Sequence, residues 1–360
     1  MDQDDGFEDR VRLSGDGAEE AAPQLAPMEY GGDGSPAARL TPALIEPWRP
    51  GELIRLDGVA ERNGFGPLMM AFFGLVVAFI LFQVVISPIA VFILLAANGV
   101  SMADLANDLA GVMAEQVGAL LTANTIGQFL GLALPTFVLV RLHTKQTGAF
   151  LRIRRADPLF LLLSAVGLVA FLPTVQWLGS VNEMIPLPES IQSFEQQQME
   201  LIEGLLTSGF SLWFGLFVLA ITPGLCEEVL FRGYIQRLSE RSLGILGGIL
   251  FSGIIFGLYH LRISQALPLS ALGIYLAYLT WRSGSLWPAI VVHIMNNAIA
   301  LGVGRYVEMS PDLSMADFEN MEIPWYLVVL SVTIFSGLFL AMQRRAERLL
   351  DETPEVLPTS

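Results

Sequence analysis

Stretches of about twenty apolar residues recur along most of this chain and constrain its fold more than any other feature. A helix that spans a bilayer needs about 20 consecutive apolar residues. Charged residues make up only 15% of the 360 residues, whereas an ordinary soluble domain carries about 25%. The sequence therefore predicts an all-α fold, a polytopic membrane helix bundle of about eight transmembrane helices. We place the spans at about 67–97, 117–140, 158–178, 208–229, 243–261, 266–281, 285–303 and 324–343.

Composition also divides the chain into regions. Residues 1–66 contain fourteen acids, six arginines and no lysine, which predicts an acidic, mostly disordered tail. In the first span, Ser87-Pro88 is expected to kink the helix. The acidic segment 182–204 is expected to be a solvated loop. The further regions are transmembrane helices 1–3 with their loops in 67–205, a catalytic core in 206–305, the last transmembrane helix in 306–350 and a tail in 351–360.

The basic residues are unevenly distributed among the loops. Loop 141–157 has five basic residues and one acid, whereas loops 98–116 and 179–206 have no basic residue and eight acids together. Short cytoplasmic loops are enriched in Lys and Arg. We therefore expect a multi-pass protein of the cell membrane with loop 141–157, the turn 237–242 and both termini in the cytoplasm.

Net charge and cysteine content exclude other classes of protein. The formal net charge is −15, which argues against nucleic acid as a partner because phosphate attracts basic surfaces. The expected partner of the apolar surface is instead the lipid bilayer. Cys226 is the only cysteine, so neither an intrachain disulfide nor a paired-cysteine metal site can form.

Two adjacent carboxylates interrupt the fourth apolar stretch, in the segment Cys-Glu-Glu-Val-Leu-Phe-Arg at 226–232. On a helix, Glu228 and Arg232 are four residues apart and can pair on one face. Glu227 points about 100° away and has no partner in its own helix. A charge at the bilayer centre costs about 2.5–3.5 kcal/mol. A structural ion pair explains Glu228 and Arg232, but it does not explain Glu227.

Two later apolar stretches carry polar residues at helical spacing. Phe256 and His260 are four residues apart in one stretch, as are His293 and Asn297 in another, so each pair shares a helix face. Either pair alone can be structural, because interhelical hydrogen bonds in membranes contribute about 0.6–2 kcal/mol. The chain has only three histidines, however, and two of them lie in these apolar stretches. This recurrence favours one functional site over separate structural contacts.

These side chains can contact one another only if they lie at similar depths below the cytoplasmic surface of the membrane. We expect the fourth span to run on through Glu227 toward Leu238. At about 1.5 Å per residue, Glu227 then lies about 16 Å from Leu238 at the expected cytoplasmic end, and His293 about 12 Å from Ser285 at its own. His260 lies about 25 Å from the end of its span on the same rise, and it fits only if 238–248 is partly outside the bilayer. We expect Glu227, His260, His293 and Asn297 to face one pocket open to the cytoplasm.

Such a group of side chains suits hydrolysis of a peptide bond. Glu227 can take a proton from water, and His260 can share that water. His293 and Asn297 can donate hydrogen bonds to a developing oxyanion. Glu227, His260 and His293 are alternatively candidate ligands of a divalent metal ion such as zinc. We favour water activation without a tightly bound ion, because few side chains are near enough in sequence to orient metal-binding histidines.

The three motifs together resemble the CPBP family of intramembrane proteases, which includes type II CAAX prenyl proteases and bacteriocin-processing or immunity proteins. They stand here as Glu227-Glu228-Val-Leu-Phe-Arg232, Phe256-Gly-Leu-Tyr-His260 and His293-Ile-Met-Asn-Asn297. The resemblance covers about 205–305. It implies the catalytic residues Glu227, His260, His293 and Asn297 and the supporting residues Glu228, Arg232 and Phe256.

The resemblance implies a peptidase that acts on membrane-associated peptides or proteins, prenylated or bacteriocin-like. The family is often described as metalloproteases, although a glutamate mechanism without metal is also argued for it. Two non-proteolytic alternatives use the same polar residues. One is a membrane transporter, since ionisable residues within the membrane also mark ion pathways. The other is an immunity or scaffold protein without turnover.

Overall fold

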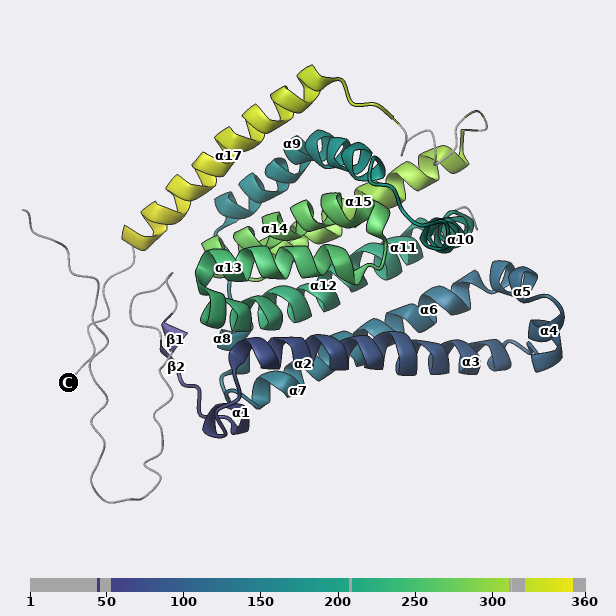
Figure 1. The fold of residues 1–360 in the computed structure, drawn as a ribbon, viewed down its shortest axis with the longest axis horizontal. Helices are drawn as coiled ribbons and strands as arrows, with labels where there is room; N and C mark the ends of the chain where they lie inside the picture. Colours follow the sequence, from purple (N-terminus) through teal and green to yellow (C-terminus); the bar gives the residue numbers. More distant parts are fainter. Residues whose placement is uncertain (1–43, 46–52, 207–208, 311, 313–320, 352–360) are drawn as a thin grey trace, which may run out of the picture. The chain divides into compact units, whose positions relative to one another are not determined.

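The computed structural model describes residues 44–45, 53–206, 209–310, 312 and 321–351 (Figure 1). Helices dominate it, and the strands of this described part are the antiparallel two-residue pair β1 (Leu44–Ile45) and β2 (Leu53–Ile54). The all-α fold class is confirmed. Within the described residues, seven helical stretches are long and apolar enough to span a membrane: Pro67–Ala97, Val117–Arg141, Pro158–Glu183, Leu212–Tyr259, Ile263–Ser283, Trp287–Glu308 and Trp325–Asp351.

The fourth stretch is a helical hairpin that accounts for two of the expected spans. Gly244 has φ 73° and ψ 173° within α13 (Gln236–Tyr259), and a residue other than glycine rarely adopts such a conformation. A Cβ on Gly248 would lie 2.6 Å from the backbone nitrogen of Glu240, so the chain doubles back on itself. The first leg therefore runs to Leu243 rather than to Leu238, where we expected the span to end.

Three spans contain π-helical segments directly before a proline. The segments η1 (Ile80–Ile86), η2 (Gln128–Ala133) and η3 (Leu216–Ile221) precede Pro88, Pro135 and Pro223. Proline lacks an N–H and clashes with the preceding turn, so the helix widens there instead of ending. At Ser87-Pro88, where we expected a kink, the structure has the π-helical segment η1 followed directly by α3. The neighbouring α-helical parts are α2 (Pro67–Phe79), α3 (Ser87–Ala97), α6 (Val117–Gly127), α7 (Leu134–Arg141), α11 (Leu212–Gly215) and α12 (Thr222–Glu228).

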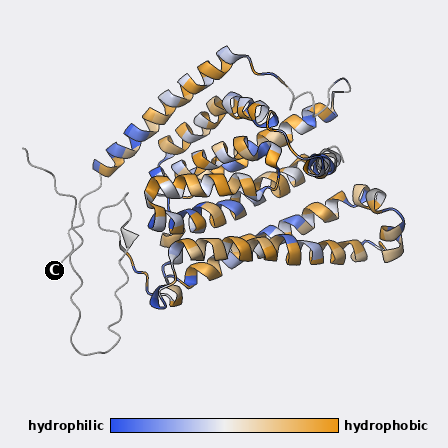
Figure 2. Ribbon diagram, in the orientation of Figure 1, coloured by the Kyte–Doolittle hydropathy of each residue, from blue (hydrophilic) through white to orange (hydrophobic). Residues whose placement is uncertain are grey.

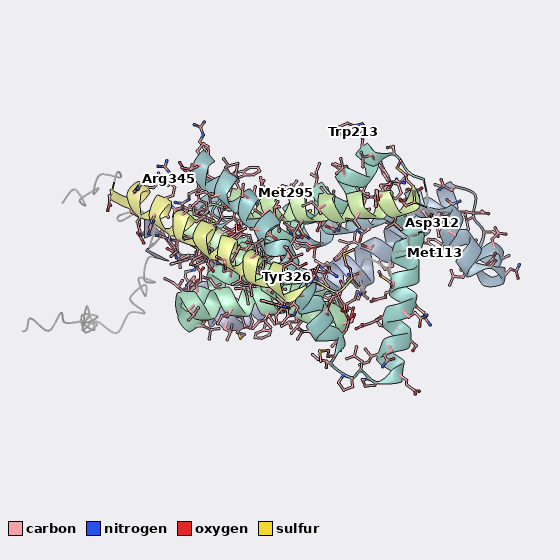
Figure 3. All side chains as sticks on the ribbon, turned by 90° about the horizontal axis from the view of Figure 1, so that it is seen from above. Met113, Trp213, Met295, Asp312, Tyr326 and Arg345 are labelled. Atoms are coloured by element: carbon pink, nitrogen blue, oxygen red, sulfur yellow. The ribbon has the colours of Figure 1, made fainter. Side chains whose placement is uncertain are left out.

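The expected loops contain helices of their own. The prediction of a loop over 182–204 is wrong, because α10 (Glu189–Leu206) occupies most of it. This helix is seen end-on in Figure 1 and lengthwise in Figure 3, so it crosses the direction of the long helices. The remaining elements are α1 (Val59–Arg62), α4 (Met102–Asn107), α5 (Leu109–Glu115), α8 (Thr147–Phe150), α9 (Pro158–Glu183), η4 (Val229–Ile235), η5 (Ile263–Gln265), α14 (Ala266–Ser283), α15 (Trp287–Glu308) and α17 (Trp325–Asp351).

Apolar side chains lie both inside and outside the bundle. One core cluster surrounds η4 and includes Phe231, Tyr234 and Phe256. A second joins α9, α14, α15 and α17. Large apolar side chains such as Phe73 and Val76 on α2 are half exposed, and Figure 2 shows apolar residues around the long helices. Helices that are apolar on all sides are typical of membrane spans, and the chain is a multi-pass membrane protein.

The basic segments meet at one end of the bundle. Arg152, in loop 141–157, forms an ion pair with Glu240 beside the hairpin bend. Arg345 near the end of α17 pairs with Asp157 at 2.7 Å. The segments that the positive-inside rule assigns to one side of the membrane therefore also lie together in space.

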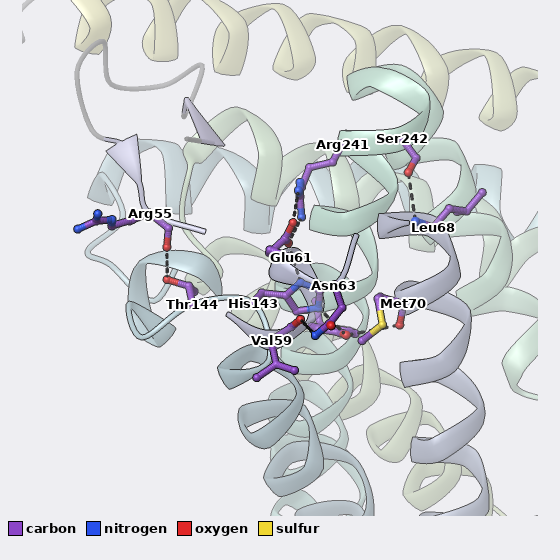
Figure 4. Close-up of polar contacts among 11 residues, drawn as sticks. Arg55, Val59, Glu61, Asn63, Leu68, Met70, His143, Thr144, Arg241 and Ser242 are labelled. Carbon is purple, nitrogen blue, oxygen red and sulfur yellow. Dashed lines mark hydrogen bonds and ion pairs between the residues drawn. The ribbon is translucent and has the colours of Figure 1, made fainter. Parts of the chain in front are cut away.

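Part of the predicted acidic tail is anchored at this end. Ile54 and Leu56 are buried, and Glu61 of α1 accepts hydrogen bonds from Arg241 at 2.6 Å and from His143 at 2.9 Å (Figure 4). Burial raises the pKa of Glu61, but these hydrogen bonds and the charge of Arg241 outweigh burial and lower the pKa from 4.5 to about 2. Residues 1–43 and 46–52 lie outside the described residues.

Ionised Glu61 should stabilise the fold in a pH-dependent manner. Because its folded-state pKa is depressed, its contribution is present above pH 4.5 and is lost as the pH falls toward about 2. Glu61→Gln removes this contribution, so the difference in melting temperature between wild type and variant should shrink over that window. A difference in melting temperature that does not change with pH would contradict the assignment. Glu189→Gln, at the exposed start of α10, is the matched control.

Candidate active site

The hairpin brings the first two motifs face to face. Glu227 and Glu228 end α12, Arg232 lies in η4, and Phe256 and His260 come at the end of the returning leg. The rings of Phe231 and Phe256 meet edge to face with centroids 5.2 Å apart. The two motifs therefore pack directly against each other across the hairpin.

The hairpin also removes the expected mismatch in depth between Glu227 and His260. Glu227 and His260 stand equally far in sequence from the bend at Leu243 and Gly244. Each therefore lies about 24 Å along its helix from the bend, at about 1.5 Å per residue. The estimate of 16 Å for Glu227 is too small because its helix continues past Leu238.

The predicted ion pair is confirmed and is fully buried. Arg232 Nη1 donates to Glu228 Oε1 at 2.8 Å, and both side chains are inaccessible to solvent. Arg232 Nη2 donates to the carbonyl of Gly273 in α14 at 3.0 Å. A Cβ on Gly273 would lie 2.5 Å from the carbonyl oxygen of Gly253, so the close crossing of α13 and α14 requires glycine there. The pair thereby joins η4 to α14.

Glu228 has a second partner that the sequence does not predict. His293 Nδ1 lies 2.7 Å from Glu228 Oε1. The approach of α12 to α15 is close, since a Cβ on Gly224 would lie 2.5 Å from Cγ1 of Ile294. Because Glu228 is paired with Arg232 and is a carboxylate, His293 Nδ1 donates to it. This leaves His293 Nε2 for any further role.

The ring of Phe256 links the three motifs. Its edge-to-face contacts place its centroid 4.9 Å from that of His260 and 5.5 Å from that of His293. The guanidinium carbon of Arg232 lies 4.3 Å from the centre of the same ring, within range of a cation–π interaction. Phe256 thus directly contacts Arg232 and both histidines.

His260 is held by its own helix and by a fixed loop. Its Nδ1 donates to the carbonyl of Phe256 at 2.8 Å, because a carbonyl can only accept. In the neutral ring Nε2 then carries a lone pair. Leu261 follows with φ 55°, a left-handed conformation that is uncommon for a residue other than glycine.

Two side chains that we had not predicted anchor the loop after His260. Buried Asn182 donates to the carbonyl of Ile263 at 2.8 Å and accepts from the backbone nitrogen of Leu267 at 2.7 Å. Buried Glu195 of α10 accepts from the backbone nitrogen of Ile263 at 2.5 Å. No spacing in the sequence points to these contacts, because the residues lie far apart along the chain.

Glu227 and Asn297 have fewer partners. Glu227 is half buried, and its Oε2 has no hydrogen-bond partner in the described part of the chain. Arg232 and Tyr259 lie within electrostatic range of it. Half-buried Asn297 accepts from Asn296 at 3.2 Å. No hydrogen bond among the described residues joins Glu227 to His260, His293 or Asn297, so their common pocket stays a prediction.

The candidate metal ligands do not gather into a binding cluster. Across the described ranges, no three His, Cys, Asp or Glu side chains lie close enough to hold a metal ion. His293 directs Nδ1 at Glu228, and His260 directs Nδ1 at the carbonyl of Phe256, which leaves Nε2 of each ring for a ligand, as in metal-binding histidines. As arranged, however, these two histidines and Glu227 do not gather into the three-ligand set of a catalytic zinc.

Comparison with known families places the motifs in context. Residues 209–299 match the family model described as Type II CAAX prenyl endopeptidase Rce1-like. This segment, called the Rce1-like segment below, is similar to that family. It contains all three motifs, so the predicted resemblance to CPBP proteases is confirmed there. The Rce1-like segment supports a CAAX-type intramembrane endopeptidase in general. Neither the curated proteins nor the solved structures give a significant match to this chain.

The anchoring of the His260 loop can be tested without substrate. Asn182→Ala or Glu195→Gln removes hydrogen bonds from this loop, so the ring-nitrogen NMR resonances of His260 should shift as its tautomer balance changes. The chain has only three histidines, and His143 serves as an unaffected internal reference. Glu189→Gln in the same helix is the control. Unchanged His260 resonances in both variants would refute the anchoring role.

Proposed function

We propose that this chain is an intramembrane endopeptidase that hydrolyses peptide bonds of membrane-associated substrates, prenylated or bacteriocin-like, at a site formed by Glu227, His260, His293 and Asn297. The observation that carries the proposal is the contact network of Glu228, Arg232, Phe256 and both histidines within the Rce1-like segment. This network couples all three motifs. A set of unrelated structural contacts would have no reason to converge on one ring and one carboxylate.

In the proposed reaction, Glu227 is the general base. Its unpartnered Oε2 is free to accept a proton from a water molecule as that water attacks the carbonyl carbon of the scissile bond. His260 Nε2 accepts the second hydrogen bond of the water and orients it. The proton then passes from Glu227 to the leaving amine nitrogen as the C–N bond breaks, which restores the carboxylate.

The proposed oxyanion donors are His293 and Asn297. His293 can donate through Nε2 only as an imidazolium, because its Nδ1 hydrogen is directed at Glu228. Asn297 donates through its amide nitrogen, because its oxygen already accepts from Asn296. Fixed donors at the site of developing charge are typically the largest electrostatic contribution to acyl transfer.

Glu227→Gln should abolish cleavage and leave the fold intact. Glutamine keeps the shape of the side chain and loses the base, so kcat should fall by about 10²–10⁴-fold. The assay uses a quenched fluorescent peptide with a farnesylated CAAX end, and the same peptide without farnesyl. Glu183→Gln, at the exposed end of α9, is the matched control. Full activity of Glu227→Gln would refute the base, and substrate flux in proteoliposomes without cleavage would favour a transporter.

The neighbouring carboxylate should behave differently. Glu228→Gln weakens both charge-assisted hydrogen bonds and removes the anion with which buried Arg232 is paired. Breaking a buried ion pair costs about 3–5 kcal/mol, so the yield and melting temperature of this variant should fall together with its activity. An inactive Glu228→Gln protein of wild-type stability would instead assign Glu228 a direct chemical role.

For the mechanism, we propose water activation by Glu227 and His260 without a tightly bound metal ion. Purified, active protein should then contain well under one zinc per chain by elemental analysis, and a chelator should leave activity unchanged. The donor set supports this expectation, because no three candidate ligands converge in the described part of the chain. About one zinc per chain, with activity lost on chelation and restored by zinc, would contradict it.

For the topology, we propose that both termini face the cytoplasm of the cell. The support is the excess of basic residues in 141–157, together with the ion pairs of this segment with the hairpin bend, through Arg152, and with Arg345 near the end of α17, through Asp157. A reporter fused after Ser360 should show cytoplasmic behaviour, and one inserted after Gly99 should show the opposite. Extracytoplasmic behaviour of the first reporter would overturn this topology.

A further inference from the structure

Tyr259 directly precedes His260 in the second motif and takes no part in the reaction proposed above. Its phenol oxygen is buried and has no hydrogen-bond partner among the described residues. Nearly all buried polar groups are hydrogen-bonded, because leaving one unpaired costs free energy. The hydroxyl of Tyr259 therefore needs a reason other than the packing of its ring.

Packing alone does not require a hydroxyl at this position. The ring of Tyr259 meets the rings of Phe231 and Phe79 edge to face, with centroids 5.1 and 5.7 Å apart. Phenylalanine at position 259 would make the same two ring contacts and would not bury an unpaired oxygen. The contacts of this side chain with the described protein therefore explain its ring and leave its oxygen unexplained.

The ring of Tyr259 borders the same part of the site as the proposed general base. Its partner Phe231 follows Glu227 by four residues, so both side chains project from one face of the first leg of the hairpin. Glu227 and His260 lie equally far from the bend, and Tyr259 is one residue from that depth. Tyr259 and Glu227 also lie within electrostatic range of each other.

The two legs of the hairpin thus each bring one buried, unpaired oxygen to the site. These are Tyr259 Oη and Glu227 Oε2, and neither has a hydrogen-bond partner in the described part of the chain. A hydroxyl can donate a hydrogen bond, whereas a carboxylate only accepts. One water molecule can accept from the first and donate to the second, and buried waters typically make about three such bonds.

We propose that Tyr259 is a further catalytic residue, whose Oη–H donates to the oxygen of the attacking water that Glu227 deprotonates. This inference rests on the proposed peptidase function. The water donates one hydrogen to Glu227 Oε2 and the other to His260 Nε2, and it accepts from Tyr259. Three groups then fix its position, and its remaining lone pair is left to attack the carbonyl carbon of the scissile bond.

The hydroxyl of Tyr259 keeps its proton throughout the reaction. As the new C–O bond forms, the proton of the water passes to Glu227, and Tyr259 continues to donate to the same oxygen in the tetrahedral intermediate. The C–N bond then breaks, and Glu227 passes the proton to the leaving nitrogen. Because Tyr259 holds the nucleophile and not the peptide, its loss should lower kcat and leave KM unchanged.

Tyr259→Phe removes only this donor. Its melting temperature should be equal to or higher than that of the wild type, because the hydroxyl has no partner in the described protein. For the better cleaved of the two quenched peptides, kcat should fall about tenfold, as for the loss of one neutral hydrogen bond. Tyr275→Phe is the matched control. Tyr275 Oη donates to the carbonyl of Ser164 at 2.8 Å, so its melting temperature should fall and its kcat should not.

Two kinetic results would overturn the role of Tyr259 and leave the proposed function intact. One is full activity of folded Tyr259→Phe. The other is a higher KM at unchanged kcat, which would make the hydroxyl a contact of the peptide instead of the water.

A double-mutant cycle tests the shared water without cleavage. Free energies of unfolding in detergent are compared for Tyr259→Phe, for Glu227→Leu, which cannot accept a hydrogen bond, and for the double variant. Groups that share a water should give non-additive effects, whereas Glu227→Leu and Tyr275→Phe should be additive. Additive effects of Tyr259→Phe and Glu227→Leu would overturn the proposal. Non-additive effects in a chain that cleaves neither peptide would support the shared water and reject the peptidase.

Discussion

The buried carboxylate of Glu228 is the interaction on which the rest of the structure depends. It accepts hydrogen bonds from Arg232 on the following π-helical turn and from His293 on α15. A buried ion is tolerated only where excellent geometry and additional hydrogen bonds offset its desolvation. Arg232 meets that requirement by also bonding to the carbonyl of Gly273 and lying over the ring of Phe256. One charge therefore fixes the relative positions of α12, α14 and α15.

The local helix geometry follows from the same interaction. Three π-helical segments stand before prolines, which explains the extra residue in each turn. The fourth, η4, contains Arg232 and no proline. π-Helical turns are often found at functional sites. In η4 the wider turn coincides with the fully buried segment between Glu228 and Gln236, where the chain must satisfy an arginine without water.

Much of this fold could be predicted from the sequence because membrane spans follow from apolar length alone. The pairing of Glu228 with Arg232 was also predictable, since residues four apart share a helix face. The contact of Glu228 with His293 was not, because helical spacing carries no information about which faces of two distant helices meet. The position of the bend was missed for a related reason. Ser242 and Gly244 are compatible both with a continuous helix and with a helix end, so only tertiary packing determines where the bend lies. Asn182 and Glu195 act on a loop that tertiary structure alone brings to them.

The hairpin bend at Gly244 has a consequence for how this chain can change in length. Equal numbers of residues separate Glu227 and His260 from the bend, one on each leg of the hairpin. The two side chains therefore stay at the same depth only while the two legs have equal length. A single residue inserted between Glu227 and Leu243 would lower Glu227 by about 1.5 Å and rotate it by about 100° relative to α13. The same insertion in the segment before α11 would leave both legs unchanged. Tolerance of insertions should therefore fall abruptly between these neighbouring parts of the chain, although both lie within the same Rce1-like segment.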